Sequence, residues 1–209
     1  MFERIAAGWY NFRHWTIFRR ELEDVAARWR GGRLLNLGCA HGPDFIPFAG
    51  SFELHGVDFA REMLFRALTY SAKHGFGASL VQADVTALPY AAGSFDWAIA
   101  IATYHHLRRE EQPAAFAELR RVLRDGGEAL VTVWSRWQPR FWREPKETLV
   151  PWHSGGETLY RYYYLFTPPE LEEGLAAAGF TTVRQFSGVA YGPPARFFSE
   201  NICLLVRKV

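Results

Sequence analysis

Short apolar runs alternate along this chain with segments whose apolar residues recur at helical spacing. The apolar runs lie at residues 34–37, 52–57, 79–83, 95–101 and 128–134. The helical segments lie at residues 2–11, 15–30, 60–74 and 113–124. Strands that alternate with helices in this way predict an α/β fold built on a mostly parallel sheet with helices on both faces.

The alternation stops after Trp134 and returns at Thr167, which forms a predicted capping box with Glu170. Pro168 suits the first position of a helix that should end at Ala178. Closing strands are expected at residues 180–190 and 199–207, which makes the predicted sheet seven-stranded. We expect one domain over residues 1–209, with an N-terminal helical cap at residues 1–32 and an insert at residues 135–166.

Composition and charge narrow the class of protein. No apolar run is long enough to span a membrane, and the charged, aromatic N-terminus is unlike a signal peptide, so we expect a soluble cytoplasmic protein. Cys39 and Cys203 lack the spacing of a metal or redox site, and no metal is expected. The net charge of +2 is too small to indicate a nucleic-acid partner by itself.

Polar chemistry gathers where three predicted strands end. The first strand runs into the turn Gly38-Cys39-Ala40-His41-Gly42, after which Pro43 and Asp44 suit the start of a helix. Asp58 ends the second strand and Asp84 the third. An acidic residue about 20 residues beyond a glycine turn is placed to accept both hydroxyls of a ribose, although aspartate also caps helices and turns. The pattern indicates an adenosine site at this edge of the sheet.

A series of short motifs carries a resemblance to the class I S-adenosylmethionine-dependent methyltransferases. In order they are LNLGCAHG at residues 35–42, GVD at 56–58, ADV at 83–85, SFD at 94–96 and LRDGG at 123–127. The resemblance implies a Rossmann-like class I methyltransferase fold and S-adenosyl-L-methionine as cofactor. The position that is usually acidic in the first motif is Asn36, and the usual middle glycine is Ala40.

By this resemblance the cofactor lies along one edge of the sheet. The turn would hold the methionine part, Asp58 the ribose, and Asp84 with Val85 the adenine. The full set expected to bind the cofactor is Arg13, Asn36, Gly38, Cys39, Ala40, Gly42, Asp58, Asp84, Val85, Ile101 and Ala102.

Residues outside these motifs must determine which methyl acceptor is used, because methyl transfer needs mainly orientation of the two substrates and exclusion of water. Tyr104-His105-His106 follows the fourth strand, where a histidine could act as a base, bind an anion or pack in the core. Residues 134–166 interleave aromatic and basic side chains, as in proteins that stack unpaired bases, although a lid packed over the site would read the same. Residues 9–15 are expected to cover the cofactor.

A narrower resemblance rests on VPWH at residues 150–153 and RYYYLF at residues 161–166. With His105-His106 they are similar to the tRNA wobble-uridine methyltransferases, which esterify 5-carboxymethyluridine at the first anticodon position. A carboxylic acid with a pKa near 4 is already ionised at neutral pH, so this reaction needs no general base. The implied partner is the tRNA anticodon loop.

The roles implied by this resemblance fall on two groups of residues. We expect His105, His106 and Arg161 to act at the reacting carboxylate, with Arg13 or Arg136 as further anion-holding residues. The residues expected to bind substrate are Tyr10, Arg108, Trp134, Arg136, Trp152, His153, Tyr162 and Tyr163.

Three alternatives stay open at this level. The resemblance also implies a small zinc-binding activator protein as a partner. The expected edge strand at residues 78–83 is apolar enough to pair with such a protein, although an ordinary edge strand covered by a loop would have the same sequence. A small-molecule methyltransferase of the quinone type would share residues 33–134. A catalytically silent methyltransferase-like module is favoured by Asn36 and Ala40.

Overall fold

The computed structural model describes residues 1–154, 156–186 and 200–209. Within these ranges the predicted seven-stranded sheet is confirmed, and its strand order is β3-β2-β1-β4-β5-β9-β8. The strands are β1 (Gly32–Leu37), β2 (Phe52–Asp58), β3 (Ser79–Gln82), β4 (Phe95–Ile101), β5 (Leu123–Trp134), β8 (Phe180–Phe186) and β9 (Asn201–Lys208). The first five run parallel, whereas β9 is antiparallel to both of its neighbours.

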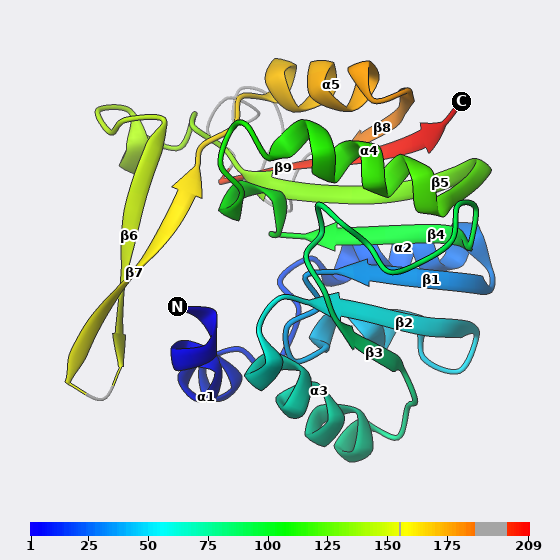
Figure 1. Cartoon of the computed structure of the whole chain (residues 1–209), viewed down its shortest axis with the longest axis horizontal. Helices are drawn as coiled ribbons and strands as arrows, with labels where there is room; N and C mark the ends of the chain where they lie inside the picture. The colour runs from blue at the N-terminus through cyan, green and yellow to red at the C-terminus, as the bar shows by residue number, and fades with distance from the viewer. Residues whose placement is uncertain (155, 187–199) are drawn as a thin grey trace.

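Helices cover both faces of this sheet because successive side chains of each strand point to opposite sides. Leu34 packs with α2 (Arg19–Trp29) and the 3-10 helix η1 (Pro43–Phe48), whereas Leu35 and Leu37 pack with α4 (Gln112–Val122) and α5 (Pro168–Ala177). In Figure 1, α4 lies in front of the strands and α2 lies behind them. None of the helices in the described residues is long and apolar enough to cross a membrane.

Several boundaries differ from the sequence-based expectation. Helix α2 starts at Arg19 because Thr16 Oγ1 accepts the Phe18 amide in a turn that delays the helix. Helix α4 ends early because Leu123 already pairs with Phe95 in the sheet. The expected closing strands included residues 187–190 and 199, which lie outside the described ranges. The predicted capping box at Thr167 is confirmed.

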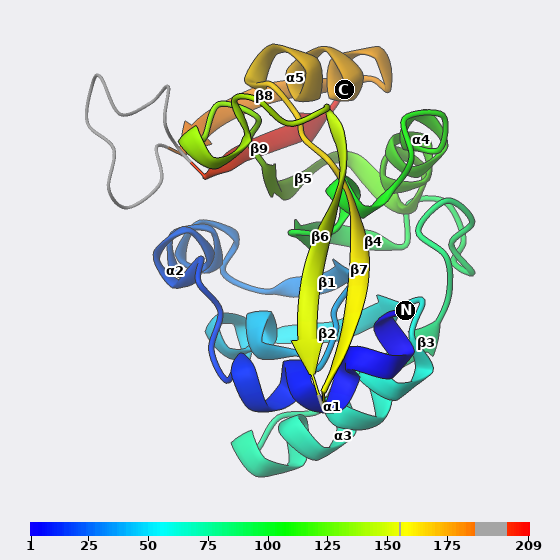
Figure 2. The same ribbon diagram turned by 90° about the vertical axis from the view of Figure 1, so that its left-hand side faces the viewer.

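Residues 135–166 contain a feature that the sequence pattern did not predict. A two-stranded antiparallel hairpin, β6 (Glu147–Ser154) and β7 (Glu157–Tyr164), follows the short 3-10 helix η3 (Pro139–Phe141). Aromatic residues on both faces hide its alternation, and Pro151 within β6 argues against a strand. Figure 2 looks onto the carboxyl ends of the parallel strands and shows the hairpin running across them.

Helix α1 (Phe2–Phe12) lies between the hairpin and α3 (Arg61–His74). The Glu3 carboxylate accepts the amide hydrogens of Arg61 at 2.7 Å and Glu62 at 2.8 Å, and so caps the first turn of α3. Arg4 forms an ion pair with Glu157 at the tip of the hairpin. These contacts fix α1 beside the strand ends.

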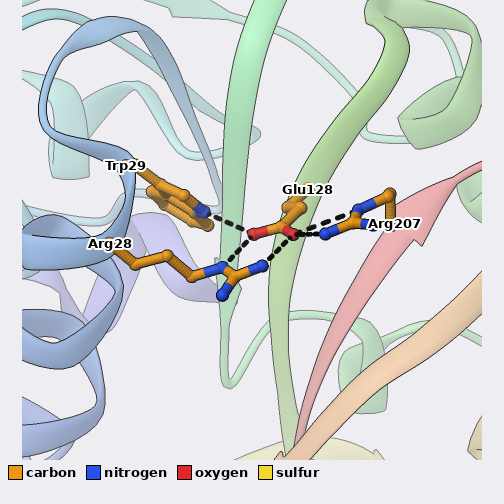
Figure 3. Close-up of polar contacts among 4 residues, drawn as sticks. All are labelled: Arg28, Trp29, Glu128 and Arg207. Atoms are coloured by element: carbon orange, nitrogen blue, oxygen red, sulfur yellow. Dashed lines mark hydrogen bonds and ion pairs between the residues drawn. The ribbon is translucent and has the colours of Figure 1, made fainter.

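A buried carboxylate joins α2 to the sheet at the opposite end. Glu128 of β5 accepts hydrogen bonds from Arg28 at 2.8 Å, from Trp29 Nε1 at 2.9 Å and from Arg207 at 2.8 Å (Figure 3). Burial alone would raise the pKa of Glu128, but the hydrogen bonds from Arg28, Arg207 and Trp29 outweigh it and lower the pKa to about 2. The cluster therefore holds three elements with a carboxylate that stays ionised.

Candidate active site

A cavity of about 590 Å³ opens at the carboxyl ends of the parallel strands. It is lined by the ends of β1, β2, β4 and β5, by α1 and the turn after it, and by the hairpin. Its volume lies within the roughly 300–1,000 Å³ of small-molecule sites. The strand topology therefore places the polar residues of several loops around one space.

The turn after β1 lacks side-chain bulk where it borders this cavity. Gly38 has φ +68°, and a Cβ there would lie 2.5 Å from Thr103 Oγ1, which donates to the Leu37 carbonyl at 2.7 Å. Ala40 is held at φ 47° and Ala102 at φ 55°, in the left-handed region that residues other than glycine rarely adopt. Both alanines line the cavity, as strained backbone often does at functional sites.

Asp58 connects this turn to the end of β2. One carboxylate oxygen accepts the Ala40 amide and the other the Ala60 amide, each at 2.8 Å. Burial raises the pKa of Asp58 to about 6, although these two hydrogen bonds lower it. Both oxygens keep a further lone pair for a ligand hydroxyl.

Asp84 and Val85 line the cavity beyond the end of β3, the neighbour of β2. Asp84 Oδ1 accepts the amide of Thr86 at 2.8 Å and its hydroxyl at 2.7 Å, which fixes the carboxylate in a turn. Met63, Val85 and Ile101 add apolar surface to the cavity. A nucleoside fits a space of this size with two carboxylates on one side and apolar walls.

His105 and His106 lie in η2 (Tyr104–His106) at the end of β4, and both line the cavity. The Trp134 amide donates to His105 Nδ1 at 3.1 Å, so the proton of neutral His105 is on Nε2. His106 Nδ1 donates to the Tyr162 carbonyl at 3.0 Å, which leaves its Nε2 as an acceptor. Burial lowers the pKa of His106 to about 4 and holds the pKa of His105 well below its usual range. Both imidazoles are therefore neutral at neutral pH.

Arg161 is the buried charge that the hairpin brings to the cavity. On one face of the hairpin, Val150, Trp152, Arg161 and Tyr163 point inward. The guanidinium carbon lies 5.5 Å from the Trp9 ring centroid, 5.2 Å from Trp152 and 5.3 Å from Tyr163. The residue is 7% exposed, and it has no ion pair within the described ranges. Burial lowers the pKa of its guanidinium, which stays charged.

Asp44 lines the cavity although the sequence assigned it only to the start of a helix. It follows the turn after β1 and is 9% exposed. Burial raises its pKa to about 6, while a hydrogen bond from Thr16 and the charge of Arg13 oppose that rise. Thr16 and Arg13 also line the cavity, and they lie in the turn that follows α1. The sequence carried no periodic signal that would bring this turn to Asp44.

The cavity brings together most of the residues that the sequence singled out. Those that line it are Arg13, Gly38, Ala40, Asp58, Asp84, Val85, Ile101, Ala102, His105, His106, Trp134, Trp152, Arg161 and Tyr163. Trp9 and Phe12, from the stretch expected to cover the cofactor, also line it, and Thr16, Asp44 and Thr103 line it without having been expected to touch a ligand.

Other expected residues are outside the lining in the described structure. Asn36 and Cys39 are fully buried, and Gly42 precedes η1 with φ +86°. Tyr10 packs its ring 5.3 Å from His41, and Arg136 donates its amide to Phe166. A second group lies on the outward face of the hairpin or over it, because neighbouring strand residues face opposite ways: His153, Tyr162 and Arg108, whose guanidinium carbon is 5.7 Å from the Tyr162 ring centroid.

Comparisons with known proteins agree with this geometry. Residues 34–127 match the family described as a methyltransferase domain. A protein of Encephalitozoon cuniculi named "Putative methyltransferase ECU09_1500" is 32% identical over 176 residues, which cover 80% of this chain and 78% of that protein. The chain is 30% identical over 142 residues to a tRNA (carboxymethyluridine(34)-5-O)-methyltransferase of Xenopus tropicalis, covering 65% of this chain but 20% of the relative's length.

A solved structure shows the same fold at low sequence identity. CalS10, an amino pentose methyltransferase from Micromonospora echinaspora that was solved with S-adenosylmethionine bound, superposes with a TM-score of 0.71. It is 20% identical, and the match covers 97% of this chain and 96% of that one. The strand order, the cavity at the strand ends and these relatives together show that the chain belongs to the class I S-adenosylmethionine-dependent methyltransferases.

Proposed function

We propose that this methyltransferase forms the methyl ester of 5-carboxymethyluridine at the wobble position of tRNA. The observation that carries the proposal is Arg161, a buried guanidinium in an aromatic box at the cavity, without an ion pair in the part of the chain that is described. A buried cation is costly unless it is paired, so a carboxylate acceptor would complete the site. The names of relatives such as the Xenopus tropicalis enzyme support the same acceptor.

The proposed reaction depends on the position of the carboxylate acceptor more than on acid–base catalysis. When bound, the cofactor supplies a methyl group on a cationic sulfur, which leaves as a neutral thioether as the carboxylate oxygen attacks the methyl carbon. The acceptor is ionised at neutral pH, so no residue has to remove a proton. Neutral His105, with its proton on Nε2, can donate one hydrogen bond to the carboxylate without adding a charge. Arg161 then supplies a buried cation that aligns the acceptor.

The arrangement of elements around the cavity gives each part of the chain a proposed role. Residues 1–209 would act as one domain in which the helical cap at residues 1–32 closes the cofactor cavity and the insert at residues 135–166 binds substrate. Most of the insert's aromatic residues are packed: Phe141 and Tyr163 lie in a cluster at the base of the hairpin, and Tyr164 and Phe166 lie in the main core. Of these four, Tyr163 lines the cavity and fits the role of a lid. Trp142 and Tyr160, which are exposed, are left as the stacking surfaces for bases near the anticodon.

The proposed activator would bind β3, which lies at one edge of the sheet. Its residues are partly exposed, and Leu80 lies beside exposed Phe65 and Leu68 in a shallow pocket. Co-purification with a small zinc-binding protein, before and after Leu80→Lys, tests this partner. An unchanged yield in the variant would rule out this edge as the docking site.

The direct test is transfer of labelled methyl from S-adenosylmethionine to tRNA that carries 5-carboxymethyluridine. We expect label on this tRNA, none on unmodified tRNA, and complete release of the label by mild alkali, because esters are cleaved under conditions that leave methylated nitrogen intact. Alkali-stable label, or equal labelling of both tRNAs, would contradict the proposal. Labelling of small carboxylic acids instead of tRNA would favour a small-molecule methyltransferase.

A further inference from the structure

Two opposite charges line the part of the cavity next to the turn after β1. Asp44 is 9% exposed, Arg13 is half-buried, and they form no ion pair with each other or with another residue in residues 1–154, 156–186 and 200–209. Each nevertheless acts on the other: Asp44 raises the pKa of Arg13, and Arg13 lowers that of Asp44, against the opposite effects of burial. Both side chains line the same cavity, so one zwitterionic ligand can contact both.

We propose that Asp44 and Arg13 together bind the zwitterionic end of the cofactor's methionine part. The Asp44 carboxylate accepts from the α-ammonium group, and the Arg13 guanidinium donates to the α-carboxylate. The proposal concerns the cofactor alone and does not depend on tRNA as the acceptor.

The strand order supports this placement. Along the carboxyl edge of the sheet, Asp84 follows β3, Asp58 follows β2, and Gly38 and Asp44 follow β1. A cofactor whose nucleoside is held at Asp84 and Asp58 therefore extends its methionine part towards the turn after β1 and towards α1. Asp44 and Arg13 lie at that end of the cavity, and Thr16 between α1 and α2 donates a hydrogen bond to the Asp44 carboxylate.

Asn36 is a second reason to expect the negative charge at the cofactor's ammonium group to come from another residue. It stands where the resemblance to methyltransferases implies an acidic residue, and it is fully buried within β1. Its side-chain oxygen and nitrogen have no hydrogen-bond partner in the described structure, and it is outside the cavity lining. Asn36 therefore brings no negative charge to the cofactor, and Asp44 supplies one from the next loop.

Three probes separate the contacts by calorimetric titration at about pH 8, where Asp44 is ionised. S-adenosylhomocysteine carries both charged groups, its decarboxylated form carries the ammonium alone, and 5′-methylthioadenosine carries neither. Asp44→Asn should weaken the first two by about 10- to 100-fold and leave the third within about twofold. Arg13→Met should weaken only S-adenosylhomocysteine, by a similar factor.

Asp84→Asn serves as the matched control, because it removes a carboxylate from the nucleoside end of the same cavity. It should weaken all three probes by the same factor. Retained binding of 5′-methylthioadenosine by Asp44→Asn also shows that the variant is folded. Equal losses for all three probes in Asp44→Asn would assign Asp44 to shaping the cavity, and unchanged binding of S-adenosylhomocysteine would remove it from the site; either result overturns the proposal.

Discussion

The buried charged residues of this protein differ in whether an opposite charge or a hydrogen-bond acceptor matches them. Glu128 is buried, but it is matched by Arg28 and Arg207, and Lys208 donates to the Leu123 carbonyl at 2.8 Å. Asp44 and Arg161 are also buried and have no ion pair within the described residues; Glu21 of α2 has none either, but of these three only Asp44 and Arg161 line the cavity. Since an uncompensated buried charge destabilises the fold, these two residues mark positions where a ligand supplies the opposite charge.

The first prediction concerns Arg161. Arg161→Gln should lower kcat/KM for tRNA bearing 5-carboxymethyluridine by at least about 100-fold, because the acceptor loses its aligning cation. Binding of S-adenosylhomocysteine should change by less than about threefold. Arg20→Gln, which removes an exposed arginine of α2 far from the insert in sequence, is the control and should retain most of the activity. A parallel loss of cofactor binding in Arg161→Gln would remove the residue from the acceptor site.

The second prediction concerns the effect of Asp44 on the unfolding free energy of the unliganded protein. Its pKa of about 6 when folded exceeds that of an unfolded aspartate, so the ionised group destabilises the fold above about pH 6 and has no such effect below about pH 4. Asp44→Asn should therefore raise the unfolding free energy by about 1–3 kcal/mol at about pH 8. Thermal unfolding should show this gain shrinking as the pH falls from about 6 to 4. A gain of the same size at both pH values would assign it to a cause other than the charge.

At the scale of elements, the cluster around Glu128 holds α2, β5 and β9 together (Figure 3). Glu128→Ala should lower the unfolding free energy by about 2–4 kcal/mol at neutral pH, because Trp29 Nε1 loses its acceptor and two arginines lose their counter-charge. Glu23→Ala breaks only the exposed Arg19 pair within α2 and should cost about 0.5 kcal/mol or less. Equal effects in denaturant unfolding would contradict this assignment.

The same cluster gives a pH dependence with a defined sign. The folded pKa of Glu128 is about 2, below that of an unfolded glutamate. Its contribution is therefore present above about pH 4.5 and is lost as the pH falls towards 2. The difference between the natural chain and Glu128→Ala should shrink over that range.

At the scale of the whole molecule, the net charge of +2 gives little attraction for a polyanion, so the proposed binding of tRNA requires local charged groups. Arg140 and Arg143 are exposed on the insert beside the hairpin. The charge reversals Arg140→Glu and Arg143→Glu should weaken tRNA binding and flatten its dependence on salt, with cofactor affinity unchanged. Filter-binding at several salt concentrations measures both effects. Affinity that is independent of salt in the natural chain would favour a small neutral acceptor.

The sequence pattern was sufficient for the order of strands and helices, because burial on both faces of a parallel sheet demands continuous apolar runs. It was also sufficient for Asp58 and Asp84, since residues at the carboxyl ends of neighbouring parallel strands share one edge. The hairpin was not predictable, because its aromatic residues pack on one face against α1 and η2 and on the other against α5 and Lys146, which removes the alternation. The resemblance to known methyltransferases already implied Arg13 and Arg161 as site residues, whereas Asp44 became one only through folding. The three residues come from distant segments, and a charge is recognisable as buried and unpaired only when every element around it is in place.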